Sequence, residues 1–248
     1  MIVIDDASEV PMIINESSFN ISLHRNNKNS GAPFSRKKGF LLSKGNFIHF
    51  HDSDDLMTEN WLFEVMQTIN NKPEIDLLMT ARLDQGHKGQ RYRKQKYFHE
   101  QVNHPKKIKS RLVYRNCMGP LGGVTFSHRV LEQIDFKAFS SCQDWQMYID
   151  AIKHSKVLYA CPDIHFIFNK TGDDRISGDA RKKILGHLQL AKVTKQESPF
   201  NNNIRLFYLY TCKQHIFNKG GGILRFYKKN RIKILWNYLR ISLYWRLH

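Results

Sequence analysis

The chain has 248 residues, of which 41% are hydrophobic and 25% charged, and this ordinary globular usage excludes a collagen, a low-complexity polymer and a wholly disordered chain. The formal net charge is +17, because 39 Lys and Arg residues outnumber 22 Asp and Glu residues, and ten of the basic residues but none of the acidic ones lie after residue 200. We therefore expect one domain with a strongly basic appendage at its carboxyl end.

Strands and helices alternate along the first two thirds of the chain. A β-branched strand over 2–4 runs into Asp5 and Asp6, a helix is expected around 35–43, and an apolar strand over 46–51 runs directly into an acidic loop. The further expected elements are a helix from 58 or 59 to 70, a strand over 75–81, a basic excursion over 84–109, a Gly-rich turn and strand over 119–126, helices over 129–134 and 144–154, and strands around Pro162 within 157–168. This alternation, with acids at strand ends, predicts an α/β sandwich whose site lies along the carboxyl edge of the sheet.

The acidic loop, Asp52-Ser53-Asp54-Asp55, is the most informative segment. Three carboxylates in four residues repel one another unless a cation lies between them, and their hard oxygen atoms suit Mg²⁺ or Mn²⁺. A divalent ion that binds a diphosphate would fit such a site. An acidic turn that caps the next helix is the alternative, since Asp is favourable at a helix start.

Two weaker motifs also place acids at element ends. Asp5 and Asp6 follow the first strand, where a simple turn is the default interpretation. Asp144, in Gln143-Asp144-Trp145, begins an amphipathic helix, where an acid is most often only an N-cap. His49 and His51 alternate on one face of the strand before the acidic loop, and we favour a packed strand over a transition-metal site.

Five segments carry a resemblance to a known family. They are Ile2–Ser8, Gly31–Gly39, Gly45–Asp55, Gly122–Phe126 and Gln143–Trp145. Taken together and in this order, they resemble the family 2 inverting glycosyltransferases, whose fold is the GT-A fold, and the segment from Gly45 to Asp55 is the most specific. The resemblance covers residues 1 to about 177 and implies a nucleotide-diphosphate sugar as donor and transfer with inversion.

The resemblance also implies roles on the donor side. Asp6 would accept a hydrogen bond from the pyrimidine base, Arg36 would lie against the nucleotide, and Asp54 would contact the ribose. The residues implied for the divalent cation, Mn²⁺ or Mg²⁺, are Asp52, Asp54 and Asp55.

On the acceptor side, the resemblance implies that Asp144 is the catalytic base. It would take the proton from the acceptor hydroxyl as that oxygen attacks the anomeric carbon from the face opposite the leaving diphosphate. The Glu that usually precedes this Asp is Gln143 here, and the loss of a neighbouring charge should make Asp144 a slightly weaker base. Weaker candidates near the acceptor or the diphosphate are Gly122, Gly123, Trp145 and Arg175. Arg175 could replace the positive charge of a His that many relatives carry where this chain has Thr171.

One departure from the family concerns the amino-terminal part of the domain. Relatives normally place a strand and a helix, roughly 30 residues as such units go, before the strand that corresponds to residues 2–4, and that unit ordinarily contributes the central nucleotide-binding strand. We therefore expect that the functional protein begins upstream of Met1, or that the chain is a weakened remnant with an exposed apolar strand edge.

The basic tail predicts a further surface. On a helical wheel at ~100° per residue, residues 229–247 have one apolar stripe, a basic stripe beside it and a second apolar stripe beyond. The first stripe contains Ile232, Leu235, Trp236, Leu239 and Leu243. This arrangement favours a helix with one face against protein and another at an anionic membrane surface, and ordinary helix packing is the alternative. The sequence has no RNP-like, zinc-finger or helix-turn-helix signature, so we expect no nucleic-acid partner.

Cysteine usage and hydropathy indicate the compartment. The four cysteines form no Cys-x-x-Cys pair and have no His at zinc-finger spacing, which argues against a structural metal and a disulfide framework. The sequence shows neither a secretory signal pattern nor a run of about 18 uncharged apolar residues. We expect a cytoplasmic protein that is peripheral at the inner face of the cell membrane.

The resemblance implies a GT-A catalytic domain over residues 1–180, incomplete at its amino end, and the charge and apolar pattern predict a basic amphipathic helical tail over 181–248. The expected function is transfer of a sugar from a nucleotide-diphosphate sugar, with uridine as the expected nucleoside, to a glycan or lipid-linked acceptor in surface polysaccharide or lipopolysaccharide synthesis. The alternative is a non-catalytic, glycosyltransferase-like binding protein, which the missing amino-terminal unit favours.

Overall fold

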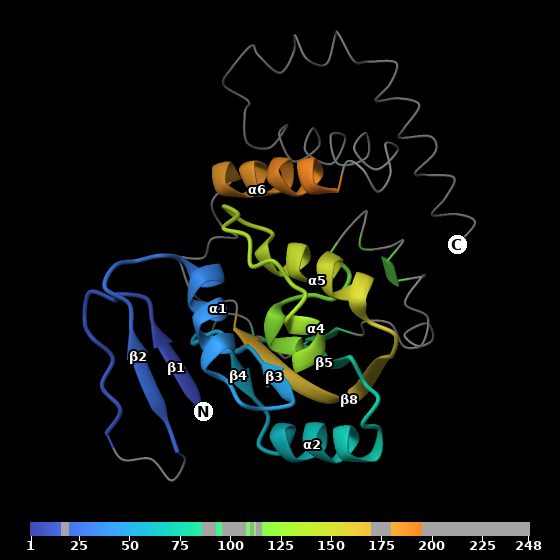
Figure 1. Ribbon diagram of the computed structural model, residues 1–248. Coiled ribbons are helices and arrows are strands. Elements are labelled where there is room, and N and C mark those ends of the chain that lie inside the picture. Colours follow the sequence, from blue (N-terminus) through green and yellow to red (C-terminus); the bar gives the residue numbers. More distant parts are fainter. Residues whose placement is uncertain are drawn as a thin grey trace, which may run out of the picture. The chain divides into compact units, whose positions relative to one another are not determined.

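The computed structural model of the protein describes residues 1–15, 20–85, 93–95, 108–109, 112, 116–169 and 180–194 (Figure 1). The chain divides into two compact units, the first comprising residues 1–138 and 143–173 and the second comprising residues 139–142 and 174–248. The predicted tail helix over 229–247, Thr171, Arg175 and most of the basic excursion lie outside the described residues. Within the described part of the chain, no helix is both long enough and apolar enough to cross a bilayer.

The first unit starts with a two-stranded parallel sheet. Strand β1 (Ile2–Asp5) pairs with β2 (Ser22–Arg25). Helix α1 (Ala32–Leu42) packs on β1, where an added Cβ at Gly39 would lie 3.6 Å from Cγ1 of Ile4. Pro33 occupies the first turn of α1, where its missing N–H breaks no helical hydrogen bond, and the helix therefore begins earlier than the sequence predicts.

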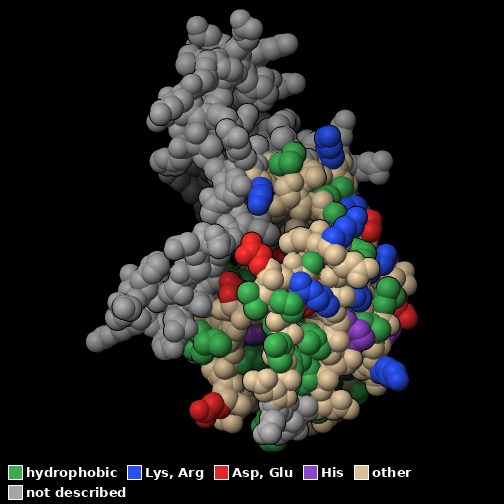
Figure 2. Space-filling view, turned by 90° about the vertical axis from the view of Figure 1, so that its left-hand side faces the viewer, with side chains coloured by type: hydrophobic (Ala, Val, Ile, Leu, Met, Phe, Trp, Pro, Cys, Tyr) green, Lys and Arg blue, Asp and Glu red, His purple; other side chains and the backbone are tan. Residues whose placement is uncertain are grey.

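Strand β2 is not predicted from the sequence. Three of its four residues are exposed, so it carries no apolar alternation. Among the described residues, β1 pairs along one edge only. Figure 2 shows hydrophobic side chains gathered on the surface of this side of the molecule. The exposed large hydrophobic residues between positions 1 and 25 are Met1, Val10, Met12, Ile13 and Leu23.

The larger sheet has the strand order β3-β7-β5-β8-β4, with β6 paired to β5 beside this path. The strands are β3 (Phe47–His49), β4 (Leu56–Met57), β5 (Leu77–Gln85), β6 (Arg93–Gln95), β7 (Val124–Ser127) and β8 (Leu158–Asn169). The strands expected around Pro162 are one strand, β8. Its register with β5 shifts opposite the step from Thr80 to Ala81, since proline offers no N–H to the ladder. The predicted alternation of α and β elements is confirmed.

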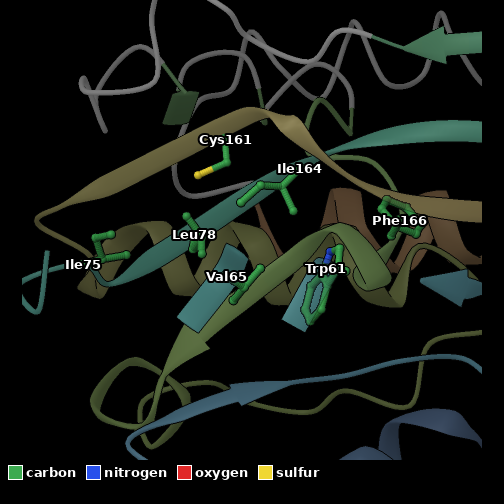
Figure 3. Packing of buried hydrophobic residues seen from close by; sticks show 7 residues of the cluster. All are labelled: Trp61, Val65, Ile75, Leu78, Cys161, Ile164 and Phe166. Carbon is green, nitrogen blue, oxygen red and sulfur yellow. The ribbon is translucent and has the colours of Figure 1, made fainter. Parts of the chain in front are cut away.

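A hydrophobic cluster joins helix α2 (Trp61–Asn71) to the sheet (Figure 3). Trp61 and Val65, one helical turn apart, are 2% and 3% exposed and pack with Leu78 of β5 and Phe166 of β8. The other described elements of the first unit are the 3-10 turn η1 (Leu121–Gly123), α4 (His128–Leu131) and α5 (Gln143–His154). The ring of Phe126 on β7 stacks on that of Tyr148 on α5, and Gly123 of η1 packs against Phe166 of β8, so the sheet supports two elements that carry the candidate site.

Asp76 connects the starts of β5 and β8 in the larger sheet by hydrogen bonds. Its carboxylate is 1% exposed and accepts hydrogen bonds from the backbone N–H groups of Lys156 and Val157 and from the side chain of Ser127. It also forms an ion pair with Arg129. A buried carboxylate with this many donors has a structural role, so Asp76, at the start of β5, is not part of the candidate site.

Candidate active site

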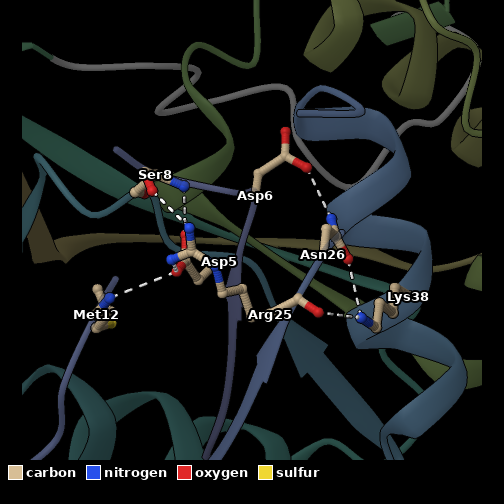
Figure 4. A network of polar contacts seen from close by, with 7 residues as sticks. All are labelled: Asp5, Asp6, Ser8, Met12, Arg25, Asn26 and Lys38. Carbon is tan, nitrogen blue, oxygen red and sulfur yellow. Dashed lines mark hydrogen bonds and ion pairs between the residues drawn. The ribbon is translucent and has the colours of Figure 1, made fainter. Parts of the chain in front are cut away.

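The end of β1 forms a tightly bonded acidic turn (Figure 4). Asp5 accepts hydrogen bonds from the backbone N–H groups of Ser8 (2.9 Å) and Met12 (3.4 Å), and it forms an ion pair with Arg25 (2.6 Å). The bonds from Ser8, followed by those from Met12 and the charge of Arg25, lower the pKa of Asp5 to about 2 against the effect of burial. Asp5 therefore stays ionised and fastens the turn to β2.

Asp6 binds the loop between β2 and α1. Its carboxylate accepts hydrogen bonds from Nδ2 of Asn26 (2.7 Å) and from the backbone N–H groups of Ser30 (3.0 Å) and Gly31 (2.7 Å). Burial acts to raise the pKa of Asp6, but these bonds outweigh it and lower the pKa below its ordinary value. Asn26 also accepts a hydrogen bond from Nζ of Lys38 at 2.9 Å, which ties α1 to the same network (Figure 4). The base-reading role of Asp6 stays a prediction, and it would use the lone pair that these donors leave.

Arg36 joins the acidic loop to the start of α5. Its side chain extends from α1 and is 11% exposed, and its guanidinium lies 2.9 Å from Oδ1 of Asp52 and 3.5 Å from Oδ1 of Asp144. The same guanidinium donates to Oε1 of Gln143 at 3.4 Å. The structure therefore brings together three predicted site residues, Arg36, Asp52 and Asp144, from three separate elements.

The pKa of Asp144 is raised above its ordinary value. Burial is the main cause and the charge of Asp52 adds to it, whereas Arg36 and the backbone N–H of Leu121 act in the opposite direction. The bond from Leu121 also ties Asp144 to η1. A carboxylate with a raised pKa is a stronger base when it is ionised, so this environment suits the proton transfer that the family resemblance implies for Asp144.

The acidic loop does not present its carboxylates as one ligand set. Asp52 is 43% exposed and bonded to Arg36, whereas Asp55 is 5% exposed and its N–H donates to the carbonyl of Asp52 at 3.1 Å. Asp54 is exposed, and its role at the ribose stays a prediction. Among the residues that the structure describes, no group of three or more His, Cys, Asp or Glu side chains could hold a metal ion. The loop in this arrangement does not fit the predicted Mn²⁺ or Mg²⁺ site, and we derive no catalytic step through a metal.

His49 packs within the sheet. Its ring centroid lies 4.3 Å from that of Trp61, and its Nδ1 lies 3.2 Å from Oγ1 of Thr125. Burial of the ring, followed by the charge of His51, lowers the pKa of His49 to about 3, so the ring is neutral. The packing interpretation is confirmed for His49. His51 is exposed, with its Nε2 3.0 Å from the carbonyl oxygen of Asp55.

The weaker candidates have packing explanations. Gly122 and Gly123 are buried against Phe166, whose nearest ring atoms would lie 3.2 Å and 2.7 Å from a Cβ added at these two positions. Trp145 is 6% exposed, and its indole N–H donates to a backbone carbonyl. The roles of these residues near the acceptor or the diphosphate stay predictions, as does that of Arg175, which lies outside the described residues.

Two contributors to the site are not predicted from the sequence. Asn26 follows β2, a strand without a sequence signal, and Leu121 acts through its backbone N–H, which any residue could supply. The only sequence hint at Leu121 is its place beside the Gly-rich turn.

A parallel pair of strands with an acidic turn at the end of β1, together with a larger sheet that carries an acidic loop after β3 and a carboxylate at the start of α5, has the architecture of a glycosyltransferase of the GT-A fold. The chain belongs to glycosyl transferase family 2, whose family model matches residues 1–134.

A curated relative from Haemophilus influenzae, an uncharacterized glycosyltransferase, is 27% identical over an alignment of 151 residues that covers 55% of this chain and 50% of the relative. The chain thus spans about half the length of the curated relative it matches. Among solved structures, TarS 1–349 of S. aureus aligns with a TM-score of 0.53 at 15% identity, over 85% of this chain and 70% of that one. The mannosyltransferase PcManGT of Pyrobaculum calidifontis, in complex with GDP-Man and Mn²⁺, aligns with a TM-score of 0.50 at 11% identity, over 97% and 75%. These structural likenesses show the fold alone.

Proposed function

We propose that the protein transfers a sugar from a nucleoside-diphosphate sugar to a hydroxyl group of a glycan or lipid-linked acceptor, with inversion at the anomeric carbon. The observation that carries the proposal is Asp144, a partly buried carboxylate with a raised pKa, 3.5 Å from the guanidinium of Arg36, in a chain of this family. Uridine is the proposed nucleoside, and synthesis of surface polysaccharide or lipopolysaccharide is the proposed setting.

In this proposal Asp144 acts on the acceptor. Its ionised carboxylate takes the proton of the acceptor hydroxyl, and that oxygen forms a bond to the anomeric carbon while the bond from this carbon to the diphosphate breaks. The nucleoside diphosphate leaves with the electron pair of the broken bond. Because the nucleophile arrives on the face opposite the leaving group, the configuration inverts. Arg36 and the N–H of Leu121 favour the ionised carboxylate and hold its orientation.

On the donor side, we propose that Asp6 contacts the base, Asp54 the ribose and Arg36 the nucleotide. A diphosphate is an anion that a guanidinium binds well, so the donor would compete with Asp52 for Arg36. The described acidic loop presents no group of side chains that could hold a metal ion, so a divalent cation enters the proposal only through the likeness to PcManGT, which is in complex with GDP-Man and Mn²⁺. Donor binding with EDTA, and then with added Mn²⁺, tests this requirement.

A non-catalytic binding protein of the same fold is the second candidate. Such a protein would bind a nucleotide sugar without breaking its bond to the diphosphate.

Release of nucleoside diphosphate across a panel of nucleotide sugars separates the two candidates. A transferase should release it from one donor class and only when an acceptor is present. A binding protein should show affinity for the nucleotide by calorimetry and no release above that of the buffer. A protein that neither binds nor cleaves any donor in the panel would contradict both.

We also propose that the basic tail holds the protein at the cytoplasmic face of the cell membrane. The support is in the sequence, which has ten cations and no acid after residue 200, and each basic residue near an anionic surface contributes about 1 kcal/mol. Flotation tests this: the protein should rise with anionic vesicles at low salt and stay at the bottom at high salt or with neutral vesicles. If it stays at the bottom with anionic vesicles at low salt, the tail does not bind membranes.

A further inference from the structure

Helix α1 belongs to the first unit, whereas helix α6 (Ala180–Val193) belongs to the second. The inner side of α1 is fixed within the first unit, where the helix lies beside β1 (Figure 1). Phe40 is buried on this side, with its ring centroid 5.0 Å from that of His128. Arg36 extends from the same helix to the acidic loop and to the start of α5. These contacts fix the orientation of the helix, and with it the side that faces solvent.

The outer side of α1 consists of Phe34, Lys37, Leu41 and Leu42, all of them exposed. Phe34 and Leu41 are 52% and 70% exposed, and at ~100° per residue they lie within about 20° of each other around the helix. Leu42 lies beyond them in one direction and Lys37 in the other. Lys38 is also on this side, but its ammonium donates to the polar network of the acidic turn. The outer side is therefore an apolar ridge with a lysine along its edge.

The charge on the outer side of α1 has one sign. The helix contains no Asp or Glu, and Lys44, two residues beyond its end, is exposed as well. An apolar ridge with lysines beside it is typical of helices that lie in the surface of an anionic bilayer. The apolar side chains of such a helix enter the lipid, and the ammonium groups stay at the lipid phosphates. The outer side of α1 thus has the chemistry of a lipid-binding surface.

Helix α2 shows an exposed apolar face without this charge. It exposes Leu62, Phe63 and Met66, yet it contains no Lys or Arg. Its acids are Glu64 and, just before the helix, Glu59, and an anionic lipid surface repels them. The exposed apolar residues of α2 therefore do not fit an anionic bilayer, and the lysines distinguish α1 from α2.

We propose that the outer side of α1 docks on a bilayer that contains anionic lipids. Phe34, Leu41 and Leu42 enter the lipid below the headgroups, while Lys37 and Lys44 stay at the lipid phosphates. This contact is separate from the basic tail, because it is built from residues of the first unit alone.

This docking places the candidate active site close to the lipid. Arg36 comes two residues after Phe34 and therefore lies about 200° around the helix from it. The side of α1 that contacts lipid and the side that reaches the site are thus opposite each other, about 10 Å apart, which is the diameter of a helix with its side chains. Such an arrangement selects a lipid-linked acceptor over a soluble one. This last step rests on the proposed transferase function, whereas the lipid contact does not.

Binding of the full chain to vesicles of phosphatidylcholine and phosphatidylglycerol tests the contact. The double variant Phe34→Ser with Leu41→Ser should bind about 10-fold or more weakly than the wild type, because two apolar side chains no longer enter the lipid. Lys37→Glu should weaken binding by about 5-fold or more and reduce its dependence on salt. The matched control is Leu62→Ser with Phe63→Ser on α2, which should bind like the wild type. The basic tail is present in every variant, so the differences report on the two helices.

Fluorescence quenching locates the helix at the bilayer without relying on affinity. Phe34→Trp and Phe63→Trp each add one indole to the full chain, and its emission is the difference from that of the wild type. Lipids brominated in their acyl chains should quench the added indole of Phe34→Trp. They should leave the added indole of Phe63→Trp unchanged.

The docking would be overturned by a wild-type protein that does not bind these vesicles, by unchanged binding of the α1 double variant, or by an unquenched indole in Phe34→Trp. Sedimentation offers a further check on what covers the outer side of α1. Self-association of the wild type that the double variant lacks would overturn the docking too, because a second copy of the chain would then cover the same side chains.

Transfer assays test the acceptor. In the α1 double variant, transfer to a lipid-linked acceptor in vesicles should fall by about the same factor as vesicle binding, and transfer to a soluble acceptor should not change. An equal loss with both acceptors would contradict the selection of a lipid-linked one. A wild-type protein that transfers from no donor contradicts the proposed function. In that case vesicle binding and quenching still decide whether α1 contacts lipid, so the two failures are distinguishable.

Discussion

The carboxylates at the end of β1 and those around Arg36 lie in the same unit, yet their charges are satisfied in opposite ways. At the end of β1, backbone N–H groups together with Arg25 and Asn26 surround Asp5 and Asp6, and the pKa of both carboxyl groups is lowered. Around Arg36, one guanidinium serves both Asp52 and Asp144, and burial raises the pKa of Asp144.

This difference separates an acidic turn, whose carboxylates are hydrogen-bonded to backbone N–H groups, from a candidate catalytic base. A carboxylate that many donors stabilise in its ionised form gains little from binding a proton. Asp144 is compensated less completely and takes a proton more readily, which is the property of a general base. The acid content of the sequence does not identify the catalytic group, since Asp5-Asp6 carries two acids and Gln143-Asp144-Trp145 carries only one.

The largest effect is expected from Asp144→Asn. The amide cannot take up the acceptor proton, so transfer should fall by about 10² to 10⁴. The Tm should stay the same or rise, because the ionised carboxylate with a raised pKa is unfavourable to the fold at neutral pH. Asp135→Asn, which changes an exposed acid paired with Lys137, is the control. If Asp144→Asn keeps most of its turnover, the base lies elsewhere.

Arg36→Gln should move the acid limb of the pH–rate profile. Arg36 is among the groups that lower the pKa of Asp144, so its loss should raise that pKa further. The base acts only when it is ionised. As the pH is lowered, the variant should therefore lose transfer activity at a higher pH than the wild type does. At neutral pH the loss should reach up to about 10²-fold, since the carboxylate also loses its orientation. Arg36→Lys keeps the charge, so it should shift the acid limb of the pH–rate profile less. If the acid limb of Arg36→Gln is the same as that of the wild type, Arg36 does not influence the pKa of Asp144.

Much of the fold is predictable from apolar spacing. Helix α2 is predicted by the recurrence of Trp61 and Val65 at one helical turn. Strand β8 is predicted by its apolar run, although Pro162 leads to the prediction of several strands where the structure has one irregular strand. Strand β2 is not predictable, because its mostly exposed residues resemble a loop until they pair with β1.

The candidate site likewise has a part that the sequence predicts and a part that it does not. Asp144 can be identified from its place at a helix start together with the family resemblance. The contact of Arg36 with the start of α5 cannot be predicted, since Arg36 and Gln143 are 107 residues apart and meet only in the folded chain. The metal set was predicted from the spacing of Asp52, Asp54 and Asp55, but spacing does not determine where each carboxylate points, and Asp52 pairs with Arg36.

Asp5→Asn tests the acidic turn at the end of β1 through the pH dependence of the protein's stability. The pKa of Asp5 is about 2 in the folded protein, against an ordinary value of 3.8. Its contribution to stability is therefore fully present at neutral pH and is lost as the pH falls from about 4 to about 2. The Tm of Asp5→Asn should lie below that of the wild type at neutral pH, and the two values should converge toward the acid end. A difference in Tm that stays constant across this range would contradict the assignment.

The smallest effect is expected at Ala7, directly after these carboxylates. Ala7 has a φ of 61°, a left-handed conformation that costs an L-residue roughly 1 kcal/mol. Ala7→Gly removes this strain, but glycine also adds freedom to the unfolded chain, which costs about 0.4–1 kcal/mol. The net gain in the free energy of unfolding should therefore lie between zero and about 0.6 kcal/mol.

Gly31→Ala is the matched opposite of Ala7→Gly. Gly31 has a φ of 85° and donates its N–H to Asp6, so alanine there should lower the free energy of unfolding by about 1 kcal/mol or more. Urea unfolding measures both variants, provided that the m-value stays the same. Suppose that Ala7→Gly were destabilising while Gly31→Ala were neutral. The two turns that bring N–H groups to Asp5 and Asp6 would then not require left-handed backbone, and the lowered pKa values of these carboxyl groups would need another source.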